Sequence, residues 1–134
     1  MDASITRQVR ERANNCCEYC RMPQAYHVRT FAVDHVIARQ HQGETQLGNL
    51  ALACLRCNSH KGPNIAGLSP DSGELTPLFH PRTDDWDAHF HWNGPYIVGR
   101  TAIGRTTIEL LTMNHPDYVA LRKSLIEEGV FPPT

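Results

Sequence analysis

Four of the five cysteines form two pairs with the same spacing, Cys17/Cys20 and Cys54/Cys57. Thiolates at this spacing make a tight pair of metal ligands, and two such pairs complete the tetrahedron that Zn²⁺ adopts in structural sites. Four protein ligands leave no position for water, so we predict a structural zinc, with a redox-active pair as the alternative. The remaining cysteine, Cys16, is expected to be a buried filler beside the first pair, or less favourably a competing ligand.

The segment between and just after the cysteine pairs carries side chains suited to hydrolysis of a phosphodiester. An imidazole such as that of His35 can accept a proton near neutral pH. The carboxylate of Asp34 and the amide oxygen of Asn58 are hard ligands of the kind that Mg²⁺ or Mn²⁺ prefers. Adjacent side chains of a regular strand point to opposite faces, so Asp34 and His35 can share one site only if the strand ends or twists there.

The motifs C-x-x-C, V-D-H, G-N-L and C-x-x-C-N-x-x-K-G follow one another over residues 17–62. Their order and spacing resemble the HNH endonucleases, which have a ββα-metal fold. The resemblance implies that His35 is the general base, that Asp34 and Asn58 hold a catalytic Mg²⁺ or Mn²⁺, and that Asn49 fixes the loop around the histidine. The family name has a histidine where this chain has Asn58, which leaves His60 as a rival ligand.

The same resemblance places basic side chains near the phosphate of a DNA substrate. Lys61 matches such a position, and Arg39, Arg56, His60 and His41 are further candidates for contact with the DNA backbone. Residues 1–62 carry eight Lys or Arg and five acidic side chains, whereas residues 63–134 carry five and nine. A basic surface on the motif half suits a phosphate-bearing partner. The alternative is a zinc module without catalytic activity that binds nucleic acid or protein.

The length of 134 residues predicts a single domain, 1–134, with the motif core at 17–62. No apolar run approaches the roughly 18 residues of a membrane helix, and the N-terminus is charged where a signal peptide is apolar. We therefore expect a cytoplasmic protein, in which paired cysteines bind metal more often than they form disulfides. Oligomeric state, base preference and the roles of His89 and His91 do not follow from the sequence.

The apolar pattern predicts an α+β fold: a small zinc-stapled ββα-metal, treble-clef-like core, an N-terminal helix, and a C-terminal hairpin followed by two helices. Residues 49–53 are apolar but too short to assign as strand or helix. The other expected elements are a helix over 4–15 capped by Ser4, a strand or hairpin over 26–36, a loop over 38–48, a short helix at 58–61 ended by Gly62, a loop over 63–86, a hairpin over 89–99, and helices over 103–113 and 115–128.

Overall fold

The computed structural model describes residues 1–133 and has the predicted α+β fold. Its strands form three separate antiparallel pairs, β1-β2, β3-β4 and β5-β6. The elements are α1 (Ala3–Arg12), η1 (Gln24–Tyr26), β1 (Ala32–His35), η2 (Arg39–His41), η3 (Leu47–Asn49), β2 (Leu50–Ala53), α2 (Leu55–Lys61), β3 (Ala66–Leu68), β4 (Leu75–Pro77), α3 (Trp86–His89), β5 (Phe90–Asn93), β6 (Tyr96–Gly99), α4 (Ala102–Leu111) and α5 (Pro116–Glu127).

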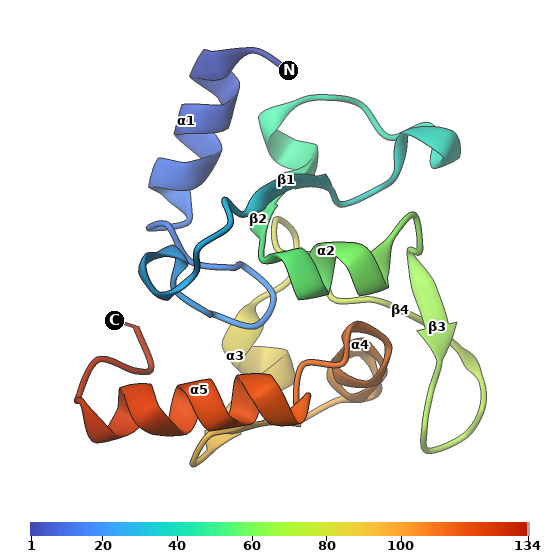
Figure 1. Ribbon diagram of the computed structural model, residues 1–134. Helices are drawn as coiled ribbons and strands as arrows, with labels where there is room; N and C mark the ends of the chain where they lie inside the picture. The colour runs from blue at the N-terminus through green and yellow to red at the C-terminus, as the bar shows by residue number, and fades with distance from the viewer. Residues whose placement is uncertain (134) are drawn as a thin grey trace.

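The motif segment folds as two strands followed by a helix. Strands β1 and β2 pair from Ala32↔Ala53 to His35↔Leu50, and β2 leads through Cys54 directly into α2 (Figure 1). All four residues of β2 are buried, which explains its continuous apolar sequence. The ambiguous segment 49–53 is thus a buried strand beginning at Leu50, and β1-β2-α2 is the ββα unit expected from the motifs.

Helix α1 begins and ends close to the predicted bounds, but its cap differs. Asp2, and not Ser4, is the residue that caps the helix. The Asp2 side chain accepts a hydrogen bond from the Ser4 backbone N–H at 2.6 Å. The helix ends at Arg12 because Asn14 and Asn15 adopt left-handed backbone angles, with φ of 52° and 55°. Arg12 then donates to the carbonyl oxygens of Leu47 and Leu50, at 2.9 and 2.6 Å, which fastens α1 to the motif core.

Three expected boundaries were wrong. Only residues 32–35 of the segment 26–36 form a strand, because the Gln24 side chain binds the Arg29 carbonyl and the Phe31 amide and holds the preceding chain in a turn. Helix α2 begins at Leu55, before the position predicted, and so contains Cys57. The segment 63–86 is not all loop, since it contains the β3-β4 hairpin. The segment 38–48 is irregular as predicted, apart from short 3₁₀ turns.

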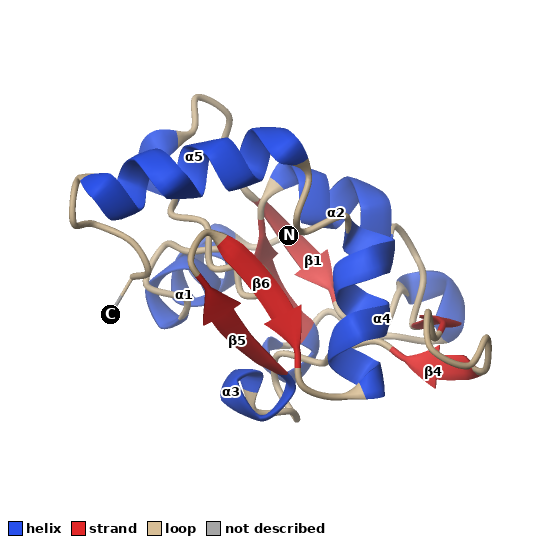
Figure 2. Cartoon of the chain, turned by 90° about the horizontal axis from the view of Figure 1, so that it is seen from below, coloured by secondary structure: helices blue, strands red, loops and turns tan. Residues whose placement is uncertain are grey.

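The C-terminal half packs against the motif core. The predicted hairpin is present as β5-β6, and α4 and α5 lie beside it (Figure 2). One continuous hydrophobic cluster includes Val9 of α1, the β2 residues, Phe90 of β5 and Phe131 near the C-terminus. The Trp86 indole N–H donates to the Tyr19 carbonyl at 2.8 Å, so the aromatic part of this core reaches the first cysteine pair directly. Among residues 1–133, no helix combines the length and apolar character needed to cross a membrane.

Candidate functional site

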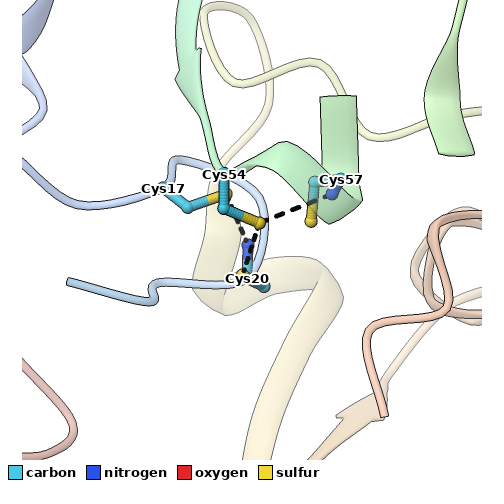
Figure 3. Close-up of side chains that lie close together, drawn as sticks. All are labelled: Cys17, Cys20, Cys54 and Cys57. Atoms are coloured by element: carbon cyan, nitrogen blue, oxygen red, sulfur yellow. Dashed lines mark hydrogen bonds between the residues drawn. The ribbon is translucent and has the colours of Figure 1, made fainter. Parts of the chain in front are cut away.

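The cysteines Cys17, Cys20, Cys54 and Cys57 meet at one buried point (Figure 3). Their sulfur atoms all lie within 4.8 Å of one another, and those of Cys20 and Cys54 are 3.7 Å apart. Zn–S bonds of about 2.3 Å in a tetrahedron place sulfur atoms roughly 3.8 Å apart. The four thiols therefore fit one Zn²⁺, and the fifth cysteine, Cys16, lies outside this group.

The surroundings of the thiols also suit a cation at their centre. Hydrogen bonds with Cys17, Cys20 and Cys57 lower the pKa of the Cys54 thiol. The hydrogen bond with Cys17 is the largest cause that raises the pKa of Cys20 and of Cys57. Four thiolates buried together repel one another and cannot all stay ionised without a positive partner. A Zn²⁺ ion supplies that charge, and we conclude that the cluster is a structural zinc site.

Local backbone geometry explains how each cysteine pair forms. The N–H groups of Cys20 and Cys57 point at the sulfur atoms of Cys17 and Cys54, at 3.5 and 3.4 Å. The second pair lies at the start of α2, where Cys54 is the N-cap residue. An anionic sulfur at that position is stabilised by the free N–H groups of the first helical turn.

Asp34 is 6% exposed, and its carboxylate contacts Tyr19, which lies between Cys17 and Cys20, and Lys61 of α2. Its Oδ2 accepts from the Tyr19 hydroxyl at 2.7 Å, and the Lys61 ammonium lies 3.4 Å from Oδ1 and 3.3 Å from Oδ2. Burial raises the pKa of the Asp34 carboxyl, and this effect is opposed by the Lys61 charge and the Tyr19 hydrogen bond. A metal ion that binds the Asp34 carboxylate would therefore have to displace the Lys61 ammonium or share the carboxylate with it.

His35 is the last residue of β1 and pairs with Leu50 of β2. Its Nε2 is 2.8 Å from the Thr45 hydroxyl, and its carbonyl accepts from Lys61 at 3.2 Å. Within residues 1–133, no hydrogen bond joins the His35 ring to Asp34 or Asn58. Asn58 is half-buried on α2, one turn before Lys61.

Asn49 holds the loop that follows β1. Its side chain accepts from the Ile37 N–H at 2.8 Å and donates to the Ile37 and Glu44 carbonyls at 3.0 and 2.9 Å. The loop approaches so closely that a Cβ on Gly43 would lie 1.7 Å from the Ile37 oxygen. These contacts fix the path of the chain from His35 to Thr45.

We expect Asn49→Ala to lower the free energy of unfolding by roughly 1–3 kcal/mol, because it leaves partly buried backbone groups of Ile37 and Glu44 without their partner. Asn64→Ala is the matched control, since Asn64 is exposed and a change there should stay within about 0.5 kcal/mol. Urea denaturation of the zinc-loaded variants measures both values. Equal stability of the two variants would contradict the loop-fixing role.

The basic side chains expected at the phosphate lie in three different settings. Lys61 is 1% exposed and paired with Asp34, whose buried carboxylate needs a counter-charge. Arg56 is half-buried, with its guanidinium 5.4 Å from the Tyr118 ring centre and 3.4 Å from the Thr112 hydroxyl. Arg39, His41 and His60 are exposed.

We did not identify from the sequence two buried polar residues that support the site, Glu18 and Tyr19. Tyr19 was overlooked although it lies between Cys17 and Cys20, where the hydroxyl of a buried tyrosine needs a hydrogen-bond partner. Glu18 was overlooked as well: it is 6% exposed, pairs with Arg82, and accepts from the Leu52 N–H at 2.9 Å. Their position between two zinc ligands was the available indication.

The comparisons with known proteins agree with the geometry. Residues 17–64 match the family described as HNH endonuclease, which confirms the resemblance found in the motifs. Over 118 residues, 87% of the chain, the sequence is 25% identical to the Septu protein PtuB of Bacillus thuringiensis. The chain spans 43% of the length of that curated relative. No solved structure matches the chain significantly.

Proposed function

We propose that this chain is a metal-dependent endonuclease that hydrolyses phosphodiester bonds of DNA. The observation that carries the proposal is the contact between α2 and the end of β1, where Lys61 binds both the Asp34 carboxylate and the His35 carbonyl. Because Lys61 and Asn58 belong to the same helix, this contact supports a site shared by Asn58 of α2 and by Asp34 and His35 of β1.

In the proposed mechanism, the neutral His35 ring accepts a proton from the attacking water. Thr45, hydrogen-bonded to Nε2, orients the ring. Asp34 and Asn58 offer oxygen ligands for Mg²⁺ or Mn²⁺, and two protein ligands leave positions for the phosphate and water. When bound, the divalent ion supplies charge stabilisation to the phosphate and the leaving oxygen. The exposed Arg39, His41 and His60 are the side chains we propose for contact with the DNA backbone, which carries no base information.

The test is cleavage of supercoiled plasmid by the zinc-loaded chain after removal of loosely bound ions. We expect no nicking without a divalent ion and nicking when Mg²⁺ or Mn²⁺ is added, with zinc content unchanged at one per chain throughout. Measuring zinc in each sample separates loss of the catalytic ion from loss of the structural one, which a chelator alone would confuse. Absence of metal-stimulated cleavage in fully zinc-loaded protein would contradict the proposal.

One observation favours a second candidate function, a zinc module that binds nucleic acid or protein without catalysis. Lys61 already neutralises Asp34 in a buried pair, as it would in a site that binds no ion. Such a module would shift DNA in a gel, or bind a protein, without cutting under any divalent ion. For either function we propose a reducing, cytoplasmic setting, because four buried thiols serve as metal ligands and form no disulfide.

A further inference from the structure

Tyr19 lies between the first two zinc ligands and reaches the candidate active site. It is completely buried, and its carbonyl accepts from the Trp86 indole. The neighbouring Glu18 exchanges hydrogen bonds with Leu52: the Glu18 N–H donates to the Leu52 carbonyl at 2.8 Å, and the Leu52 N–H donates to the Glu18 carboxylate. The backbone that carries Tyr19 is thus fixed by zinc on both sides, by the aromatic core and by β2.

The two oxygens of the Asp34 carboxylate differ in their contacts, because the Tyr19 hydroxyl bonds with only one of them. Oδ2 accepts the short hydrogen bond from Tyr19, at 2.7 Å, and lies 3.3 Å from the Lys61 ammonium. Oδ1 has only the Lys61 contact, at 3.4 Å. A carboxylate offers about four acceptor positions, so Oδ1 keeps the larger share of free lone pairs. Rotation of the carboxylate is opposed because it would break the shorter bond.

We propose that Tyr19 is a positioning residue that holds Asp34 by Oδ2, so that Oδ1 is the oxygen that would bind a divalent ion, and that Tyr19 thereby links the zinc site to the proposed ion site. This inference rests on the proposed function. The hydroxyl acts only through Asp34 and touches neither the phosphate nor water. The link gives the zinc site a second role: distortion of the Cys17-Cys20 turn displaces the tyrosine and turns the carboxylate.

The test is Mn²⁺ affinity of the full, zinc-loaded chain, measured by the electron paramagnetic resonance signal of free Mn²⁺. Tyr19→Phe keeps the ring in the core and removes only the hydroxyl. We expect one zinc per chain to remain and Mn²⁺ binding to weaken roughly 10- to 100-fold, because a hydrogen bond to a charged group is lost. Tyr26→Phe is the matched control: Tyr26 is 43% exposed in η1, and the Asp34 carboxylate bonds with Tyr19 and Lys61 instead, so the Mn²⁺ affinity of this variant should equal that of the parent chain.

Asn58→Ala separates failure of the inference from failure of the proposed function. If Asn58→Ala and Tyr19→Phe both weaken Mn²⁺ binding, the inference is supported. If Asn58→Ala weakens binding while Tyr19→Phe leaves it unchanged, the positioning role is overturned and the ion site stands. If the parent chain binds no Mn²⁺, or if Asn58→Ala binds it as tightly as the parent, the ion site itself is overturned.

A second measurement does not require that Tyr19→Phe fold. The chain has four tyrosines, and 3-fluorotyrosine labelling gives one ¹⁹F resonance for each. Variants of Tyr26, Tyr96 and Tyr118 to phenylalanine assign three resonances and leave the fourth to Tyr19. We expect the Tyr19 resonance to shift when diamagnetic Mg²⁺ is added and that of exposed Tyr26 to stay in place. A Tyr19 resonance unmoved at saturating Mg²⁺ would overturn the inference.

Discussion

Replacing Cys54 by serine is expected to remove the zinc and unfold the protein. Zinc contributes about 10–16 kcal/mol to folding in small zinc-binding peptides, and whole domains are stable by only about 5–15 kcal/mol. Serine is a good N-cap residue, so Cys54→Ser preserves the helix cap at the start of α2 while it removes the thiolate. Loss of the fold can therefore be assigned to the metal. Zinc content by mass spectrometry and thermal unfolding followed by circular dichroism measure the two effects.

Cys16→Ser is the control for this experiment. Cys16 lies outside the four-thiol cluster, and its Sγ is 3.4 Å from the Asn14 carbonyl, a contact that a serine hydroxyl can replace. We expect that variant to keep one zinc per chain and to melt within a few degrees of the parent, as substitutions outside the core contacts usually do. A folded Cys54→Ser protein without zinc would show that the hydrophobic core alone holds the structure.

The zinc site and the ββα order could be predicted because the relevant information is local. The spacing of Cys17/Cys20 and Cys54/Cys57 defines two ligand pairs whatever lies between them. The C-terminal hairpin was likewise readable, since Asn93-Gly94 falls between two short apolar runs and Gly94 adopts a φ of 56°. The environment of the proposed ion site was less predictable, because it depends on contacts between distant parts of the chain.

Asp34 illustrates what the sequence could not provide. Its partners Tyr19 and Lys61 lie 15 and 27 residues away, and both were assigned elsewhere or overlooked. The burial of Lys61 could not be predicted from the sequence, because lysine is almost never fully buried unless it is paired. The strand that contains Asp34 was also predicted too long. A turn held by the Gln24 side chain competes with strand formation over residues 26–31.

The proposed catalytic role of His35 gives the second large effect. His35→Ala should lower the rate of plasmid nicking by about 10²- to 10⁴-fold, the usual contribution of a general base. Stability should change little, because the ring is half-buried and makes only the bond to Thr45, worth about 1 kcal/mol. The same variant should keep its zinc and its Mn²⁺ affinity, since the imidazole is not assigned as a ligand. Loss of rate without loss of metal distinguishes a base from a structural histidine.

His41→Ala supplies the matched control, because His41 is an exposed histidine in the loop between His35 and Thr45. The substitution removes an imidazole close in sequence to the site. Because His41 is proposed to contact the DNA backbone, its loss should weaken DNA binding more than it slows the chemical step. Added imidazole should restore part of the activity of His35→Ala and none of that lost in His41→Ala, since only the former lacks a proton acceptor. If His35→Ala cuts DNA as fast as the parent chain, the base lies elsewhere, and the Thr45-bound ring serves only to hold the loop.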